Sequence, residues 1–325
     1  MPIRPLQSAD LKNLLACFQS FPFKAGQQRF QKLDAKRLNE RFLSPEAQRL
    51  DKLPTDRPMQ WVGLKNDKLC CYAALHPDAW HSGIYGITCG RIAPFLTHLA
   101  DPALRLELLD TALAAADREG FHHLSARIDG SEYAALNAFA ERGFYPVDCS
   151  VKMAGWLSKT PRFEPVSAAG MSVRPYRADD LPILQKIAAT EHPYNHYYND
   201  PHLPREATSE LFAGWVAKCC NGLASDVFVL DAAGEPQGFV IYLEPVGLNH
   251  DMGTRLGILD FVCLNPSVRG GGLGRRFIAE TLQALGGRFN MVELRTSQNN
   301  YPAMACYMDL GMRITSTDFV MHGVR

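Results

Sequence analysis

The chain has 325 residues, and its 34 lysines and arginines balance its 34 aspartates and glutamates. At about 150 residues per domain, this length predicts two domains, each long enough to bury its own core. A formal charge of zero argues against a nucleic-acid partner held by electrostatics and against a basic membrane-surface helix. Hydrophobic residues make up 46% of the chain, which predicts a folded protein rather than a disordered one.

The N-terminal residues lack the apolar core of a signal peptide, and no stretch approaches the ~18 consecutive apolar residues of a membrane span. We therefore expect a cytoplasmic protein without a membrane partner. The nine cysteines are odd in number and contain no C-x-x-C, which predicts buried, reduced thiols.

Two halves of the sequence repeat one plan at an offset of 168 to 170 residues. Residues 3–11 match residues 173–181, and residues 139–144 match residues 307–312. Each half is expected to open with a short strand and an aspartate that caps the following helix, and to close with a helix that ends at a left-handed glycine. The aspartates are Asp10 and Asp180, and the glycines are Gly143 and Gly311.

Residues 158–171 have the proline, serine and glycine content of a linker. We predict an N-terminal domain over residues 1–157 and a C-terminal domain over residues 172–325. The C-terminal half shows a hairpin pattern over 226–243, a strand pattern over 256–264, a helix pattern over 275–285 and another strand over 291–296. This order predicts a mixed α/β (α+β) sheet covered by helices.

Four glycines lie in the turn between the strand at 256–264 and the helix that follows. Backbone N–H groups without side chains can approach a ligand closely, and a helix N-terminus adds positive potential, so the turn predicts a phosphate or pyrophosphate site. Arg269 and Arg275 flank the turn and can pair with phosphate oxygens. The turn lacks the Gly-Lys-Ser/Thr of a P-loop and the spacing of a dinucleotide fingerprint. A flexible turn with helix-capping glycines remains the alternative.

The frame Arg-x-x-Gly-x-Gly, formed by Arg269, Gly272 and Gly274, resembles the acetyl-CoA loop of the GCN5-related N-acetyltransferase (GNAT) superfamily. Residues 300–307 are similar to the superfamily's Asn-x-x-Ala-x-x-x-Tyr, and the resemblance extends over residues 172–322. It implies acetyl-CoA (coenzyme A) as the cofactor. The residues implied to bind it are Val262, Cys263, Leu264, Arg269, Gly270, Gly271, Gly272, Leu273, Gly274, Arg275, Asn300 and Tyr307.

The same resemblance implies that Tyr307 is the general acid toward the CoA sulfur, with a structural core ring as the alternative. Asp260 interrupts an apolar strand, where a carboxylate is costly unless it is paired or opens onto a cleft. We expect Asp260 to accept the proton of the substrate ammonium, or else to serve as a structural hydrogen-bonding group. Glu293 and Glu244 are weaker candidates for the same task.

Aromatic and polar residues gather in residues 192–200 and are the candidate acceptor side. Their rings can stack on a base or a sugar face, and packing of this loop against Trp215 is the alternative. The predicted substrate-binding residues are Tyr194, His196, Tyr197, Asp200, Trp215 and Glu244. A metal site is not expected, because Pro193 disturbs the spacing of His192 and His196 and no H-E-x-x-H is present.

Residues 197–204, 211–215, 296–300 and 316–319 resemble the GNAT branch that acetylates nucleotide-linked amino sugars, of which TDP-fucosamine acetyltransferase is typical. This implies an N-acetyltransferase whose partner is a small-molecule primary amine, most directly a nucleotide-linked amino sugar. The alternatives are an aminoglycoside, an amino acid derivative, a mycothiol-synthase-like acceptor, or a non-catalytic acetyl-CoA-binding sensor. The oligomeric state, including a homodimer, stays open.

The first half has lost the glycine turn. At the offset of 168, Asp101, Pro102, Leu104 and Leu106 stand where the second half has Arg269, Gly270, Gly272 and Gly274, and Phe139 stands in place of Tyr307. An aspartate repels pyrophosphate, and leucines place side chains where backbone must touch a ligand. We therefore expect a tandem in which the N-terminal domain is a degenerate GNAT-like fold that does not bind acetyl-CoA.

Overall fold

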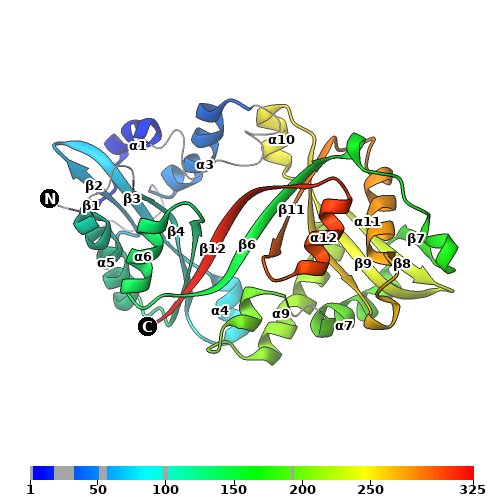
Figure 1. The fold of residues 1–325 in the computed structure, drawn as a ribbon. Helices are drawn as coiled ribbons and strands as arrows, with labels where there is room; N and C mark the ends of the chain where they lie inside the picture. Colours follow the sequence, from blue (N-terminus) through cyan, green and yellow to red (C-terminus); the bar gives the residue numbers. More distant parts are fainter. Residues whose placement is uncertain (1–2, 18–32, 51–56, 98–101, 192–193) are drawn as a thin grey trace. The chain divides into compact units, whose positions relative to one another are not determined.

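The structure is a computed structural model that describes residues 3–17, 33–50, 57–97, 102–191 and 194–325 (Figure 1). The chain forms two compact units. Unit 1 comprises residues 1–149 and 316–325, and unit 2 comprises residues 150–315. Each unit contains parallel and antiparallel strands with helices packed on them, which confirms the predicted mixed α/β class.

In unit 1 the strands follow the order β1-β2-β3-β4-β5-β12. Only the β4–β5 pair is parallel among the strand pairs described within this unit. The elements are β1 (Ile3–Pro5), α1 (Leu11–Cys17), α3 (Ala35–Leu50), β2 (Gln60–Lys65), β3 (Lys68–Pro77), α4 (Ala79–Tyr85), β4 (Cys89–Thr97), α5 (Pro102–Arg118), β5 (His123–Asp129), α6 (Tyr133–Glu141) and β12 (Arg313–Val324).

Unit 2 repeats this plan with the strand order β6-β11-β10-β9-β8-β7 and a parallel β10–β11 pair. Its elements are β6 (Tyr145–Trp156), β7 (Ser172–Pro175), α7 (Leu181–Glu191), α8 (His196–Asn199), α9 (Arg205–Lys218), β8 (Asp226–Ala232), β9 (Glu235–Leu243), α10 (Val246–Met252), β10 (Leu256–Leu264), α11 (Leu273–Ala284), β11 (Met291–Ser297) and α12 (Tyr301–Asp309). The predicted hairpin, the strand at 256–264 and the helix and strand after it are all present, with ends that differ by two residues or fewer.

The last strand of each half pairs inside the other unit. Residues 150–156 of β6, which ends the first half, pair with β11. Residues 318–324 of β12, which ends the chain, pair with β5. The units therefore divide at residues 149/150 and 315/316, whereas the composition of the sequence places the boundary at 158–171. The linker at 158–171 stays a prediction, and composition does not indicate which sheet receives each terminal strand.

The first segment of each half contains an equivalent arginine–aspartate ion pair. Arg174 donates from Nη1 and Nη2 to the carboxylate of Asp180 at 2.7 and 2.8 Å, and Asp180 also accepts the backbone N–H of Arg177. Arg4 and Asp10 repeat the pair in unit 1. Each aspartate is the third residue of a 3₁₀ turn that leads directly into the helix, and its carboxylate accepts the backbone N–H of the residue before that turn, so it takes part in a capping box rather than acting as the N-cap residue of the α-helix itself.

The closing helices of the two halves also match. Gly143 follows α6 with a φ of 82°, and Gly311 follows α12 with a φ of 83°. Both values lie in the left-handed region that glycine adopts without a Cβ penalty. The predicted glycine ends of these helices are therefore confirmed.

Helices cover both faces of the sheet of unit 2 (Figure 1). On one face, residues of α11 and α12 form a hydrophobic cluster with Tyr242 and Leu259. On the other face, Phe212 of α9 contacts Phe261 of β10 with ring centroids 5.7 Å apart. Phe261 in turn meets Phe239 of β9 edge to face at 5.2 Å. The two faces of β10 thus present different neighbours to anything that binds at its end.

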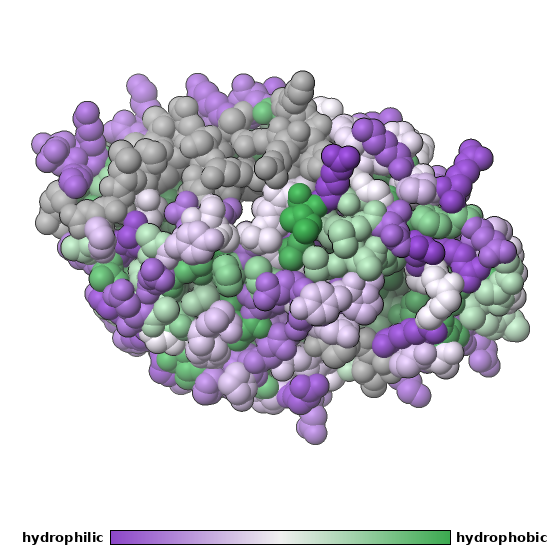
Figure 2. Space-filling view, in the orientation of Figure 1, coloured by the Kyte–Doolittle hydropathy of each residue, from purple (hydrophilic) through white to green (hydrophobic). Residues whose placement is uncertain are grey.

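Figure 2 shows hydrophilic residues spread over the visible face of the described residues, interspersed with smaller apolar areas. Many of the large apolar side chains lie instead in clusters within each unit. Across the described helices, none is both long and apolar enough to cross a membrane.

Candidate active site

The sheet of unit 2 opens between β10 and β11. Their parallel pairing covers Leu256 to Leu259 of β10 and then stops. Beyond this point β10 still pairs with β9 as far as Leu264, and β11 still pairs with β6 as far as Ser297. The two strands therefore diverge toward their carboxyl ends. We call this region the β10–β11 opening, and an extended ligand can add to a strand edge there.

A β-bulge interrupts β10 where the opening begins. The register with β9 shifts between Leu259 and Phe261, which leaves Asp260 as the extra residue. The Oδ2 atom of Asp260 accepts a hydrogen bond from the indole Nε1 of Trp215 on α9, at 2.7 Å. Burial raises the pKa of Asp260 above its usual range, and the bond from Trp215 offsets part of that rise. Such a carboxylate exchanges protons closer to neutral pH than an ordinary aspartate does.

The glycine loop follows the same strand. Gly270, Gly271 and Gly272 have φ values of 102°, 54° and 74°, which lie in the left-handed region. A Cβ added at Gly270 or Gly271 would meet no atom within 4 Å, so the backbone at these two positions is open to a ligand. Gly272 is the N-cap of α11, whose first N–H groups have no partner within the helix. The loop therefore fits a pyrophosphate such as that of CoA.

The two arginines beside this loop have protein partners in the structure. Arg269 donates from Nε to the carbonyl oxygen of Leu264 at 3.0 Å. Arg275 forms an ion pair with Asp309 of α12, and its guanidinium lies 4.8 Å from the ring centroid of Phe163. Their role toward phosphate oxygens stays a prediction, which for Arg275 requires sharing the guanidinium between Asp309 and the ligand.

Tyr307 projects from α12 into the core of unit 2. Its side chain is 4% exposed and lies in the same cluster as Leu259 and Leu294, with Val262 packed against that cluster. Its hydroxyl forms no hydrogen bond with any residue that the structure describes. Burial raises the pKa of Tyr307 above its ordinary value, so the phenol keeps its proton at neutral pH. Tyr307 is therefore a proton donor without a protein acceptor in this state.

Tyr307 and Asp260 lie on opposite faces of the opening. Tyr307 belongs to the face covered by α11 and α12, whereas Asp260 reaches the face covered by α9. A carbonyl group held between the diverging strands would thus have a proton donor on one side and a proton acceptor on the other. This arrangement suits acyl transfer to an amine, which needs both.

The other predicted cofactor residues line the same strand and the next helix. Val262 and Leu264 are half-buried and pack on the cluster of α11 and α12, and Leu273 begins α11. Cys263 faces the opposite way and contacts α7. Asn300 is the N-cap of α12, where its side-chain oxygen accepts a backbone N–H bond at 3.4 Å. The structure brings these residues to the carboxyl ends of β10 and β11, and contact with a cofactor stays a prediction.

The two other predicted carboxylates are neutralised by neighbours. Glu293 on β11 is 7% exposed and pairs with Nζ of Lys152 at 2.9 Å. Glu244 follows β9 and pairs with Arg288 at 2.7 Å. The strand register puts Glu244 at the amino end of β10, about 20 Å from the glycine loop at about 3.4 Å per residue. The structure therefore does not bring Glu244 to the loop.

Part of the predicted aromatic cluster packs against α9. Tyr194 is 39% exposed, and the rings of His196 and Tyr197 lie 3.9 Å apart. Tyr198 stacks on Phe212 of α9 at 5.6 Å. The cluster thus packs on α9 through Phe212 rather than through Trp215, the residue that the sequence suggested.

Trp215 instead turns its indole N–H to Asp260. Asp200 is buried, and its Oδ1 accepts the backbone N–H of His202 at 2.8 Å. His192, part of the predicted acceptor cluster, lies outside the described residues.

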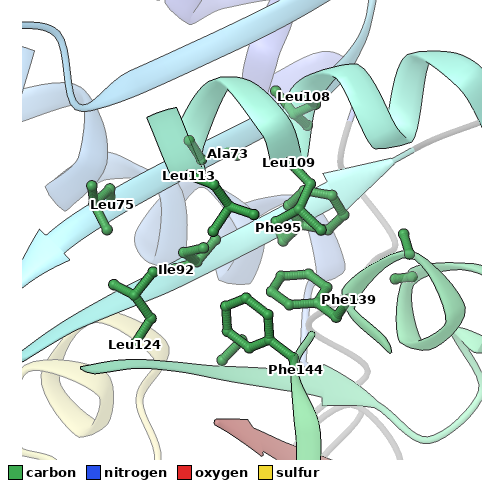
Figure 3. Packing of buried hydrophobic residues seen from close by; sticks show 14 of the residues in the cluster. Ala73, Leu75, Ile92, Phe95, Leu108, Leu109, Leu113, Leu124, Phe139 and Phe144 are labelled. Carbon is green, nitrogen blue, oxygen red and sulfur yellow. The ribbon is translucent and has the colours of Figure 1, made fainter. Parts of the chain in front are cut away.

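The corresponding opening of unit 1 is filled. β4 and β5 pair from Cys89 to Ile92 of β4 and then diverge, as β10 and β11 do. Three residues beyond the last pair, Phe95 occupies the position that Val262 has in unit 2. Its ring meets Phe139 edge to face at 5.0 Å, and Phe139 meets Phe144 at 4.9 Å (Figure 3). These rings leave the opening packed with protein atoms.

The glycine loop also has no counterpart in the described part of unit 1. Helix α5 already begins at Pro102, and Leu104 is buried in the hydrophobic core. Leu106 packs against the same core, while Asp101 lies outside the described residues. At these positions the side chains of unit 1 pack in its core, whereas the glycine loop of unit 2 leaves its backbone open to a ligand.

Three features of the site were not predicted. The Trp215–Asp260 bond joins residues far apart in sequence, and no local pattern indicates it. Arg276 supports the loop by donating to the Gly271 carbonyl oxygen at 3.4 Å and pairing with Glu164 of the linker. The third is the filling of unit 1 by Phe95, whose equivalence to Val262 comes from the strand pairing, because the repeat offset of 168 aligns Phe95 with Cys263 instead.

Comparison with known proteins finds matches in the second half of the chain. Residues 185–312 match the acetyltransferase (GNAT) family, in agreement with the resemblance seen in the sequence. The spore coat polysaccharide biosynthesis protein SpsD of Bacillus subtilis (strain 168) is 25% identical over 167 residues, which cover 51% of this chain. The match spans 55% of SpsD, so the chain covers about half the length of this curated relative.

Solved structures extend the likeness to the whole chain. A GCN5-related N-acetyltransferase from Sphaerobacter thermophilus has a TM-score of 0.63 at 15% identity, covering 99% of this chain and 95% of that one. A tandem GNAT protein from the clavulanic acid biosynthesis pathway has a TM-score of 0.56 at 13% identity, covering 99% and 98%. At these identities the likeness concerns the fold, and it agrees with two GNAT-like domains in tandem.

Proposed function

We propose that the GNAT acetyltransferase domain formed by residues 185–312 transfers an acetyl group from acetyl-CoA to the primary amine of a nucleotide-linked amino sugar. The observation that carries this proposal is the β10–β11 opening. It joins a glycine loop that fits a pyrophosphate to a strand gap flanked by Tyr307 and Asp260.

The shape of the β10–β11 opening supports acetyl-CoA as the acetyl donor. The glycine loop would hold the pyrophosphate, and the extended pantetheine arm would add to the edge of β10 around Val262 to Leu264. Asn300 at the start of α12 would border the same arm. A thioester carbonyl would then lie near the bulge at Asp260. These placements rest on the loop conformation and on the strand register.

Acetyl-CoA supplies an acetyl thioester, whose C–S bond breaks as the C–N bond to the acceptor forms. Asp260 accepts one proton from the acceptor ammonium and thereby frees the nitrogen lone pair. Tyr307 donates its phenolic proton to the departing sulfur and regains a proton from the amide nitrogen. Asp260 releases its proton to water, so one proton leaves for each acetyl group transferred. Burial keeps Tyr307 protonated, and it raises the pKa of Asp260 toward neutral pH.

The acceptor class rests on two supports. The relative SpsD is named as a spore coat polysaccharide biosynthesis protein, which favours a sugar-linked acceptor. The rings of Tyr194, His196 and Tyr197 are partly exposed, and Tyr197 contacts Phe212 of α9, the helix that also carries Trp215. Rings so placed can stack on a nucleotide base or a sugar face. Asp260 reaches the sheet face that α9 covers, so an acceptor bound there would approach the carboxylate.

We further propose that only unit 2 binds acetyl-CoA. Phe95 and Phe139 fill the opening of unit 1, and α5 begins where a phosphate loop would be needed. Unit 1 also completes its sheet with β12, the last strand of the chain. Its contribution is therefore structural rather than catalytic.

The proposal is tested by measuring thiol release from acetyl-CoA with a panel of amines: nucleotide-linked amino sugars, free amino sugars, aminoglycosides and cysteinyl conjugates. Highest kcat/KM with a nucleotide-linked amino sugar supports the proposal. Preference for another amine overturns the acceptor assignment and keeps the enzyme class. Acetyl-CoA binding without turnover of any amine would instead identify a sensor.

A further inference from the structure

Trp215 forms the one hydrogen bond that the structure shows for the Asp260 carboxylate. The indole Nε1–H donates to Oδ2 at 2.7 Å, and Oδ1 has no partner among the described residues. The sequence places the two residues 45 positions apart, on α9 and on the bulge of β10. One carboxylate oxygen is therefore fixed by protein, and the other is left for a ligand.

We propose that Trp215 is a positioning residue, which holds Asp260 so that Oδ1 is presented to the acceptor ammonium. This inference rests on the proposed function, because it assigns a partner to the proton acceptor of that reaction. An indole suits the task, since Nε1–H only donates and the ring has a single polar atom. Trp215 therefore fixes the orientation of the carboxylate without competing for the proton.

The setting of Trp215 makes its orientation well defined. The residue lies near the C-terminal end of α9, one turn after Phe212, which packs between Tyr198 and Phe261. The bulge then turns Asp260 toward this helix rather than along the strand. Rigid helical support on one side and a β-bulge on the other together preorganise the pair.

Unit 1 provides an internal comparison. Ile92 is the last residue of β4 that pairs with β5, as Leu259 is the last residue of β10 that pairs with β11. The next residue is Ala93 in unit 1 and Asp260 in unit 2. The carboxylate is thus absent from the unit whose opening is filled.

The other titratable groups around Asp260 are neutral or paired. Cys219, just beyond α9, has its pKa raised to about 12 by burial, so its thiol stays neutral. On β11, the neighbouring strand, Glu293 is neutralised by Lys152 of β6. Tyr242 of β9, opposite Leu259, is buried and bonded to Thr281. A proton exchanged near neutral pH at this point of the site therefore belongs to Asp260 or to the acceptor.

The hydrogen bond itself is tested without turnover, by NMR of the unliganded full chain labelled with ¹⁵N-tryptophan. The chain has four tryptophans, and the Trp215→Phe variant identifies the Nε1–H signal of Trp215. We expect this signal to titrate with Asp260 and to stop titrating in Asp260→Asn. A Trp215 signal that does not respond to pH in the wild-type protein would overturn the inference.

The positioning role is tested by the pH profile of kcat/KM with the best acceptor. Loss of the indole donor removes a bond that favours the charged carboxylate, so Trp215→Phe should move the acid limb upward by about one pH unit. It should also lower kcat at neutral pH by about tenfold, with an unchanged KM for acetyl-CoA. Trp156→Phe, a tryptophan of β6 outside the site, is the matched control and should match the wild type.

The outcomes separate this inference from the proposed function. If Trp215→Phe turns over the acceptor and the acid limb of its kcat/KM profile lies at the same pH as in the wild type, the positioning role is overturned. The acetyltransferase assignment then stays intact. Absence of turnover with every amine would overturn the proposed function and, with it, the role of Trp215.

Discussion

Tyr307 is the seventh residue of α12, and Phe139 is the seventh residue of α6, the equivalent helix of the first half. Both rings are buried in the core of their own unit. Phe139 packs against Phe95 and Phe144, whereas Tyr307 carries a hydroxyl that no described residue binds. The same position of a repeated fold thus serves packing in one unit and, as we propose, proton donation in the other.

Tyr307→Phe tests the chemical half of this contrast. Removing the hydroxyl leaves the packing of the ring in place, so we expect unfolding stability within about 0.5 kcal/mol of the wild type. Loss of a general acid should lower kcat by about 100-fold or more while the KM for acetyl-CoA stays similar. Steady-state kinetics and urea unfolding measure the two effects. Full kcat in the variant would refute the assignment of Tyr307.

Phe139→Ala tests the structural half. The ring is fully buried and makes edge-to-face contacts at 5.0 and 4.9 Å, so its removal should lower stability by about 3–5 kcal/mol. Tyr133→Ala on the same helix is the matched control, because Tyr133 is 70% exposed and should tolerate the change. Chemical denaturation checks both variants. A loss below about 1 kcal/mol in Phe139→Ala would show that unit 1 has room at its opening.

Asp180→Asn tests the ion pair that opens unit 2. Two hydrogen bonds from Arg174 hold the pKa of Asp180 below its usual range. This stabilisation is complete above the unfolded pKa of about 3.9 and is lost as the pH falls through the lower folded value. We expect the variant to lose about 1–3 kcal/mol at pH 7, with a smaller difference from the wild type below pH ~4.

Urea unfolding across pH 3 to 7 measures this difference. Asp179→Asn, at the exposed neighbouring residue, is the control and should lose little at any pH. A difference between Asp180→Asn and the wild type that does not change with pH would contradict the electrostatic explanation.

Much of the second half followed from its sequence. The glycine turn, the strand before it and the tyrosine helix after it carry local signals, because left-handed backbone requires glycine and buried strands require apolar runs. The structure places Gly270 to Gly272 in left-handed conformations and β10 at its predicted bounds. Local chemistry decided these features, so a single sequence was sufficient to predict them.

The features that sequence did not predict depend on contacts between distant segments. Strand β6 could in principle pair in either unit, and it pairs with β11 of unit 2. The alternation of apolar residues along β6 does not specify which strand becomes its partner. The bond between Trp215 and Asp260 joins a helix to a bulge, and the bulge itself is visible only in the register of β9 and β10. The sequence indicated a capping role for Asp10 and Asp180 but not which backbone N–H each one accepts, because an aspartate near a helix start can accept bonds from either side.

The central claim is that one acetyl-CoA site exists and that the glycine loop of unit 2 forms it. Calorimetric titration of the full chain with acetyl-CoA tests it directly, alongside the double variant Gly272→Leu with Gly274→Leu. Gly287→Leu is the control, because a side chain there meets no atom within 4 Å and the backbone is not left-handed. Thermal unfolding of all three proteins verifies that each is folded.

We predict one site per chain in the wild type and in Gly287→Leu. In the double variant, affinity should fall by about 100-fold or more, which corresponds to ~2.7 kcal/mol, because side chains fill the space that the pyrophosphate needs. Two sites of similar affinity, or binding that survives the double substitution in a folded protein, would contradict the claim.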